Sequence, residues 1–145
     1  MNKETDLSPV VPGLFSLPPY DKKPPSLLGA FCPDCNRYYF PRPKYCPRCL
    51  APASQIPLKS NGTIYSYTVV RIKPPFGLPS PYSVIYVDLT EVDLRVFGLF
   101  DPEAIDRLRI GLDVELAAGP LGINSQGQSC LRPYFKLRKQ MKDRE

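Results

Sequence analysis

Four cysteines are the residues of this 145-residue chain whose types and spacing most directly indicate chemistry. They form two Cys-Pro-x-Cys tetrads separated by ten residues: Cys32, Cys35, Cys46 and Cys49. In each tetrad a tight turn lets two thiolates converge on one metal, while backbone N–H groups of the turn can point at the sulfurs. Four sulfurs at about 2.3 Å complete the tetrahedral coordination of Zn²⁺ and leave no position for water or substrate. The pattern therefore predicts a structural zinc site.

Two disulfides or an iron–sulfur centre are alternative uses of the same four cysteines. Residues 1–30 contain no apolar run of the length found in a secretory signal, and charged residues such as Asp6, Asp21 and Lys22 interrupt them. The sequence also has no run of 18 apolar residues. These observations favour zinc over disulfides, and we expect a soluble, cytoplasmic protein.

The residue that follows the second cysteine of each tetrad usually adopts a left-handed backbone conformation, which glycine and asparagine tolerate best. Asn36 fits this requirement and Leu50 does not. We therefore expect the second knuckle to turn differently from the first.

The absence of histidine bears on whether the chain is an enzyme by itself. Histidine is the side chain most often used for acid–base catalysis near neutral pH, so its absence argues against independent catalysis. The fifth cysteine, Cys130, has no neighbouring base in the sequence. We favour a small buried strand residue over a nucleophile for this position.

The net charge of +5 raises the question of nucleic-acid binding. Residues 136–145 hold five basic and two acidic side chains, whereas residues 59–118 hold six basic and eight acidic ones. The positive charge is thus mostly a tail and not a stripe along a groove. This distribution weakens the interpretation of a nucleic-acid-binding protein.

The first half of the chain predicts an arm and a small metal module. Residues 1–29 contain six prolines and scattered apolar side chains, which predicts an extended arm that packs on its own domain or on a partner subunit. Residues 30–50 form the predicted rubredoxin-like zinc ribbon, in which Tyr38, Tyr39 and Phe40 are expected to cover the metal. Residues 51–60 are expected to form a linker.

Residues 61–138 predict a mostly β domain, followed by a basic tail at 139–145. β-branched and aromatic residues alternate with turn residues, and Asp101-Pro102 resembles the start of a short helix. We expect strands at 63–73, 82–89, 94–100, 113–118 and 129–137, a loop at 119–128, and the helix between the third and fourth strands. Five strands with a helix in that place follow the order of the OB-fold barrel.

These pieces together resemble a family of zinc-ribbon plus OB-fold proteins first described as a domain of unknown function. The matching segments are FCPDCNRYYFPRPKYCPRC at 31–49, GTIYSYTVV at 62–70, PFGLPSPYSVIYVDL at 75–89 and YFKL at 134–137. Leu50 departs from the glycine that is common after the last cysteine of the family. The resemblance implies an accessory role in acyl-CoA metabolism, in a hetero-oligomer with an enzyme of the thiolase superfamily that carries the nucleophilic cysteine. The length of the arm favours degradative thiolases, such as the benzoylsuccinyl-CoA type.

A contact with CoA or acyl-CoA is a further expectation. Arg71, Lys73, Phe76 and Tyr82 flank the proline-rich segment after the first barrel strand, where cations could bind phosphate and rings could contact adenine. A solvated pair of charges beside a rigid loop is the alternative. For the whole chain, a noncatalytic thiolase subunit is favoured over a single-stranded nucleic-acid-binding module and over an independent enzyme.

Overall fold

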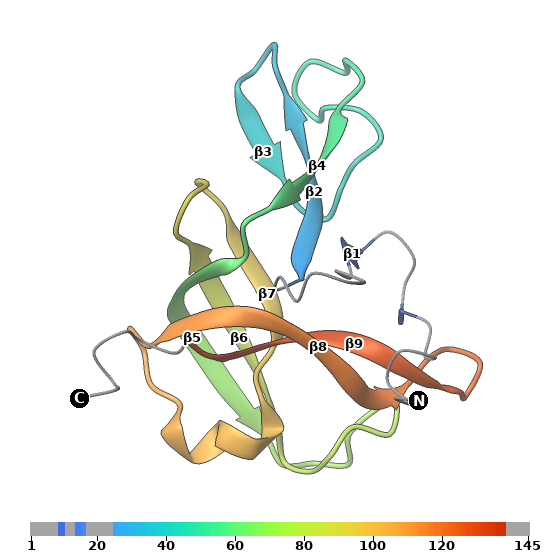
Figure 1. Cartoon of the computed structure of the whole chain (residues 1–145), viewed down its shortest axis with the longest axis vertical. Coiled ribbons are helices and arrows are strands. Elements are labelled where there is room, and N and C mark those ends of the chain that lie inside the picture. The colour runs from blue at the N-terminus through green and yellow to red at the C-terminus, as the bar shows by residue number, and fades with distance from the viewer. Residues whose placement is uncertain (1–8, 11–13, 17–24, 139–145) are drawn as a thin grey trace.

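Two β-sheets make up the computed structural model, which describes residues 9–10, 14–16 and 25–138 (Figure 1). The first sheet contains β1 (Phe15–Ser16), β2 (Ser26–Cys32), β3 (Arg37–Tyr39) and β4 (Ser54–Leu58). The second contains β5 (Asn61–Val70), β6 (Tyr82–Leu89), β7 (Arg95–Leu99), β8 (Asp113–Ile123) and β9 (Ser129–Leu137), with the 3-10 helix η2 (Pro102–Arg107) between β7 and β8. The chain is therefore mostly β, as the sequence predicts.

The first sheet is the zinc ribbon, and it is larger than expected. Its strand β2 pairs with β4 along one edge and with β1 and β3 along the other. The prediction of a linker at 51–60 is wrong, because residues 54–58 form β4. Leu58 of β4 lies opposite Leu27 of β2, and both side chains are buried. The boundary of the arm at residue 29 is also too late, since β2 begins at Ser26. The basic tail at 139–145 lies outside the described residues.

The arm packs against its own chain wherever it is described. Phe15 is buried and pairs with Leu27 of β2, and Val10 donates a backbone hydrogen bond of 2.7 Å to Leu131 of β9. The arm was expected to pack either on its own domain or on a partner subunit. The described residues pack on their own domain.

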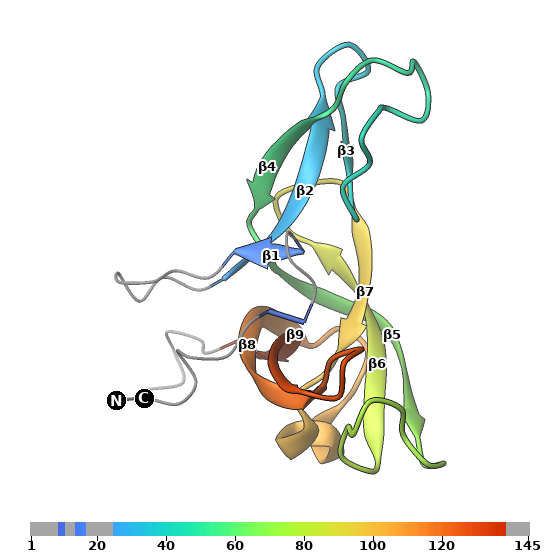
Figure 2. The same cartoon turned by 90° about the vertical axis from the view of Figure 1, so that its right-hand side faces the viewer.

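The second sheet curls into a five-stranded, nearly closed barrel in the order β7-β6-β5-β8-β9 (Figure 2). Its two end strands meet at a bridge between Phe100 and Phe135. The predicted strands at 82–89 and 129–137 agree with β6 and β9, and the expected short helix is present as η2, with the Asp101 carboxylate accepting the N–H of Glu103.

Several barrel boundaries differ from the expectation, most of all the ends of β5 and β8. β5 ends at Val70 and not at residue 73. β8 continues to Ile123, through the first half of the loop expected at 119–128, because its pairing with β9 resumes after a register shift between Pro120 and Ile123. Cys130 is fully buried in β9, as predicted.

Ser60 joins the ribbon to the barrel. Its hydroxyl accepts the N–H of Leu27 at 2.9 Å and donates to the carbonyl of Leu58 at 2.6 Å, and its carbonyl accepts the N–H of Leu116 at 2.9 Å. Leu27 and Leu58 also belong to the same buried cluster as barrel residues such as Val87. Hydrogen bonds and a shared core therefore hold the two modules together.

No helix within the described ranges is both long and apolar enough to cross a membrane.

We predict that Ser60→Ala destabilises the chain by about 1–3 kcal/mol, because the buried N–H of Leu27 loses its acceptor. Urea unfolding monitored by circular dichroism measures the change. Ser54→Ala, an exposed position on β4, serves as the matched control. An equal, small effect of both substitutions would show that the Ser60 hydroxyl does not hold the modules together.

Candidate metal centre

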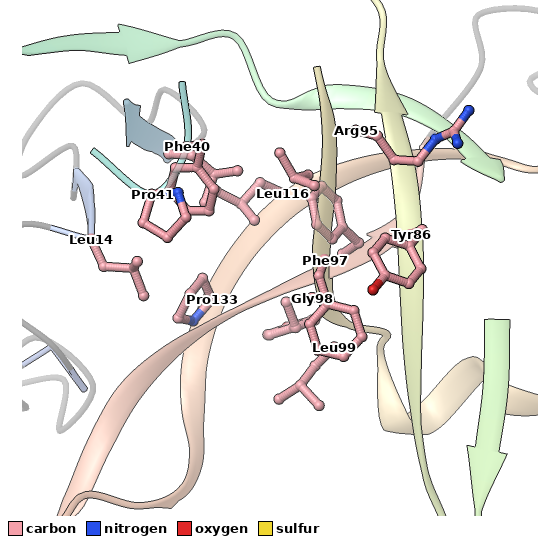
Figure 3. A pocket seen from close by; sticks show the side chains of 14 residues that line it. Leu14, Phe40, Pro41, Tyr86, Arg95, Phe97, Gly98, Leu99, Leu116 and Pro133 are labelled. Atoms are coloured by element: carbon pink, nitrogen blue, oxygen red, sulfur yellow. The ribbon is translucent and has the colours of Figure 1, made fainter. Parts of the chain in front are cut away.

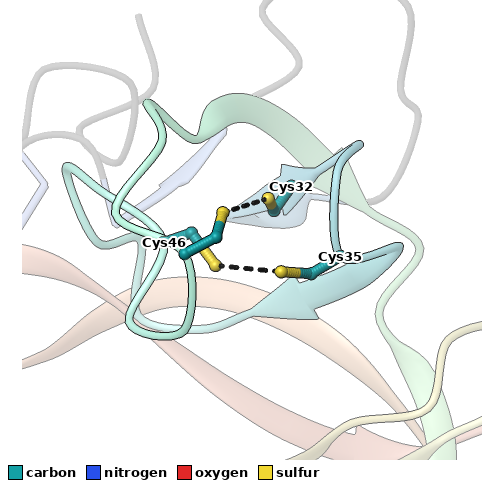
Figure 4. Close-up of side chains that lie close together, drawn as sticks. Cys32, Cys35 and Cys46 are labelled. Atoms are coloured by element: carbon teal, nitrogen blue, oxygen red, sulfur yellow. Dashed lines mark hydrogen bonds between the residues drawn. The ribbon is translucent and has the colours of Figure 1, made fainter.

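The four cysteine sulfurs converge on one point between the two knuckles, residues 32–36 and 46–50. All four Sγ atoms lie within 4.8 Å of one another, and the Cys32–Cys49 and Cys35–Cys46 pairs are 3.5 and 3.8 Å apart. A tetrahedral zinc with Zn–S bonds of about 2.3 Å requires sulfurs about 3.8 Å apart. Figure 4 shows Cys35 and Cys46 facing each other across the site. The donor set thus fits a structural Zn²⁺.

The disulfide alternative does not fit this geometry. All five cysteines are free, and even the 3.5 Å separation far exceeds the S–S bond of about 2.05 Å. Cys32 and Cys46 are buried, Cys35 is half-buried and Cys49 is exposed at the rim. Four protein sulfurs would complete the coordination of a zinc ion and leave no position for substrate.

The two knuckles turn in the same way, which corrects the expectation for Leu50. Asn36 donates its N–H to the carbonyl of Cys32 at 2.7 Å, and Leu50 donates to the carbonyl of Cys46 at 2.8 Å. Their φ angles are 56° and 64°. A leucine adopts this conformation at a cost of about 1–2 kcal/mol. Because its side chain is 75% exposed, it meets little steric obstruction there.

Tyr39 is a neighbour of the site that sequence reasoning assigned only to covering the metal. Its hydroxyl lies 3.3 Å from Cys46 Sγ. This hydrogen bond is the main cause that lowers the pKa of the Cys46 thiol to about 6, and the backbone N–H of Arg48 at 3.4 Å adds to it. The pKa of Cys35 is raised to about 12, chiefly by its hydrogen bond with Cys49. The Tyr39 hydroxyl therefore stabilises the thiolate form of Cys46, which is the form that binds metal.

We predict that Tyr39→Phe weakens zinc binding about tenfold or more, because Cys46 loses a donor that stabilises its thiolate. Competition with a chromophoric chelator at neutral pH measures the affinity. Tyr38→Phe is the control. The centre of the Tyr38 ring lies 4.8 Å from that of the Phe31 ring, and this substitution leaves the hydrogen bond between Tyr39 and Cys46 in place. Equal affinities of the Tyr39 and Tyr38 variants would contradict the role of the hydroxyl.

We predict that Cys46→Ser removes zinc and unfolds the two knuckles while the barrel remains folded, because the ribbon has few buried residues apart from those shared with the barrel. Elemental analysis and backbone amide exchange measure the two effects. The control is Cys130→Ala, which changes the cysteine outside the metal cluster and should keep its zinc. A Cys46→Ser protein with full zinc content, or one whose barrel also unfolds, would contradict this assignment.

The residues predicted to contact CoA lie at the segment between β5 and β6, which we term the cation loop (residues 71–81). Arg71 and Lys73 are exposed, and neither forms an ion pair with a described residue. Phe76 is 55% exposed, and the guanidinium of Arg132 lies 5.6 Å from the centre of its ring. Tyr82 is half-buried at the start of β6. The loop thus presents two cations and one accessible ring.

The loop is fixed to the barrel beneath it. The carbonyl of Phe76 accepts the N–H of Ile123 at 2.7 Å, and Leu78 is buried. Tyr82 lines a hollow of only about 10 Å³, formed with Leu78, Phe100 and others. Tyr82 therefore packs under the loop, and its ring is less accessible to a ligand than the ring of Phe76.

A larger cavity, which sequence reasoning missed, lies between the ribbon and the barrel (Figure 3). We term it the seam cleft; its volume is about 370 Å³. Its walls are mainly apolar and come from four separate parts of the chain, namely the arm, β2 with the residues after β3, the strands β6 to β8, and β9. Because these parts are far apart in the sequence, no local motif indicates the cleft.

Comparison with known proteins places this architecture in a family. Residues 21–54 match the model of the ChsH2 rubredoxin-like zinc ribbon domain, and residues 55–118 match the ChsH2 C-terminal OB-fold domain. Benzoylsuccinyl-CoA thiolase subunit BbsA of Thauera aromatica is 32% identical over 135 residues, which cover 92% of this chain and 91% of that protein. The chain belongs to the ChsH2 (DUF35) family.

Two further members of this family are similar to the chain. A DUF35 domain-containing scaffold protein of Methanocaldococcus jannaschii is 32% identical over 92 residues, which cover 61% of this chain and 64% of that protein. A chain of the solved structure of the Ltp2-ChsH2(DUF35) aldolase superposes with a TM-score of 0.61 and 26% identity, over 77% of this chain and 84% of that one. The predicted combination of zinc ribbon and OB-fold is thereby confirmed.

Proposed function

We propose that this chain is a noncatalytic, zinc-binding subunit of a thiolase-type acyl-CoA enzyme complex. The observation that carries the proposal is the similarity to a benzoylsuccinyl-CoA thiolase subunit over nearly the full length of both proteins. The similarity to a protein described as a scaffold supports a role in assembly. The same BbsA similarity supports thiolysis of a degradative, aromatic acyl-CoA as the reaction of the complex.

The side chains of the chain support a role without catalysis of its own. Thiolase chemistry needs an activated nucleophile and a base. Four of the five cysteines form the metal cluster, and the fifth, Cys130, is fully buried in β9. The sequence contains no histidine. The partner subunit therefore supplies the nucleophile and the base.

We further propose that the cation loop contacts the CoA moiety at the entrance of the partner's active site. Arg71 and Lys73 would bind phosphate oxygens, and the exposed Phe76 would contact the adenine ring, with Tyr82 supporting the loop. The anchoring of the loop by Phe76 and Leu78 supports this role, since a fixed loop loses little entropy when a ligand binds.

The test of the subunit proposal is purification of the tagged full-length chain from its native cells, followed by mass spectrometry of the intact complex. We expect a thiolase-fold subunit in a defined stoichiometric ratio. Cys46→Ser, which removes the metal centre, is the control and should lose the partner. A chain that elutes alone, or with a protein of another fold in the same fixed ratio, would contradict the proposal.

We predict that Arg71→Ala with Lys73→Ala raises the KM of the complex for CoA several-fold with little change in kcat, because the contact exists in the ground state and the transition state alike. The control is Arg42→Ala with Lys44→Ala, which removes an exposed arginine and lysine of the same spacing from the ribbon and should leave the KM for CoA unchanged. Steady-state thiolysis over a range of CoA concentrations measures both variants. An unchanged KM in the loop variant would contradict the CoA contact.

A further inference from the structure

The barrel strand β7 has one edge without a strand partner among the described residues. β7 ends the sheet order β7-β6-β5-β8-β9 and pairs with β6 from Arg95 to Leu99. On its other side, β9 closes the barrel at the bridge between Phe100 and Phe135, where Asp101 also donates its N–H to Phe135. Among the described residues, the edge without a strand partner therefore runs from Arg95 to Phe97. An edge of this kind is a template for the addition of another extended chain.

The hydrogen-bond register shows which backbone groups face that free edge. Leu89 donates its N–H to Leu94, and Phe100 donates its N–H to the carbonyl of Ser83. In an antiparallel pair the bonded residues alternate along the strand. Val96 and Gly98 therefore bond to β6, whereas the N–H and C=O groups of the intervening Arg95, Phe97 and Leu99 point away from it.

These groups point toward the seam cleft. Residues 95–99 of β7 line one side of the cleft, and Pro133 of β9 lies on the other side (Figure 3). Pro133 has no N–H to offer, and Phe40 and Pro41 of the ribbon add an apolar surface. The cleft thus combines a row of main-chain donors and acceptors on one side with apolar side chains elsewhere, as an extended peptide with apolar side chains requires.

Exposed aromatic side chains of β6 and β7 form the outer part of the cleft lining. Phe97 and Tyr86 are 56% and 44% exposed, and their ring centres lie 5.0 Å apart. Beside them, the guanidinium of Arg95 lies 3.4 Å from the centre of the Tyr65 ring. Exposed aromatic residues and arginine are enriched at the energetic centres of protein interfaces.

The charge of this surface favours a protein over a nucleic acid. The guanidinium of Arg95 donates to both carboxylate oxygens of Asp88, at 2.6 and 3.3 Å, so its charge is already balanced. A single nucleic-acid strand binds where free cations line the aromatic face. Arg71 and Lys73, which form no ion pair with a described residue, lie on the cation loop, at the opposite end of the barrel from the ribbon (Figures 1 and 2).

The chain already covers neighbouring edges with its own extended segments. Pro9 forms a parallel bridge with Leu131 of β9, and β1 adds to the edge of β2. Leu14, between these two contacts, and Leu27 both line the seam cleft. Extended segments thus pair at two places around the cleft, while the edge of β7 stays without a strand partner in the part of the chain that the structure describes.

We propose that β7 receives an extended segment of a partner polypeptide as an added strand. Its main chain pairs with Arg95 and Phe97, its apolar side chains enter the seam cleft, and its remaining side chains pack beside Phe97 and Tyr86. The identity of that partner as the thiolase-type subunit rests on the function proposed above, whereas the strand addition itself rests on the free edge and the cleft.

Amide hydrogen exchange on the native complex and on the free chain tests the proposal. Exchange in the peptide spanning residues 94–100 should slow about tenfold or more for the amides of Arg95 and Phe97 when the partner is bound. A complex that contains a thiolase-fold subunit but leaves these amides unprotected would overturn the strand addition and leave the subunit function intact. Protection by a partner of another fold would support the strand addition and contradict the subunit function.

A pair of variants at one position separates the backbone bond from the side chain. Phe97→Pro removes an N–H that faces the cleft, at an edge position where proline is tolerated, whereas Phe97→Ala removes only the ring. We expect Phe97→Pro to bind the purified partner subunit about fivefold to tenfold more weakly than Phe97→Ala, with both retaining zinc and the same melting temperature. Ile110→Ala, at an exposed site on the segment between η2 and β8, should bind like the wild type.

Equal binding by the two Phe97 variants would overturn the proposal. If Phe97→Pro lowers the melting temperature, the exchange measurement on the wild-type complex decides instead. A labelled oligo-dT strand added to the free chain should leave the 94–100 peptide unprotected. Protection of that peptide by oligo-dT at physiological salt would identify the surface as a nucleic-acid site and overturn the proposal.

Discussion

The convergence of four cysteine sulfurs is the constraint that holds the ribbon together and, through it, the surfaces that the ribbon forms with the barrel. The ribbon is too small to bury a core of its own, so metal binding supplies much of its folding free energy. Its few buried apolar residues, Leu27 and Leu58 among them, belong to the barrel's core. Ser60 adds hydrogen bonds from the junction to β2 and to β8. The metal centre thus positions a ribbon that is coupled to the barrel.

This coupling creates the surfaces that carry the proposed function. The seam cleft has walls from both modules, so it depends on the ribbon keeping Phe40 and Pro41 above β7 and β9. The cation loop lies at the far end of the barrel and is held by Phe76 and Leu78 (Figures 1 and 2). A chain with two separate surfaces and four converging sulfurs is suited to the proposed role, in which it binds a partner subunit and that subunit carries out the chemistry.

Cysteine spacing and strand periodicity predicted the metal cluster and most of the barrel, because both depend on residues close in the sequence. Leu50 was predicted wrongly, since the convergence of the sulfurs imposes the same turn on both knuckles and outweighs the preference of a single residue. β4 was taken for a linker because its pairing with β2 is a contact between distant segments. The cleft and the contact between Tyr39 and Cys46 could not be predicted, since they exist only once the sheets pack.

The most direct test of a noncatalytic subunit role is acyl-CoA thiolysis by the separated and recombined subunits of the native complex. We expect no turnover by the zinc-loaded chain alone at any concentration, reduced turnover by the partner alone, and recovery of full activity at a fixed molar ratio when the two are mixed. Turnover by the chain alone, or a partner whose kcat and KM are unchanged when the chain is added, would contradict it.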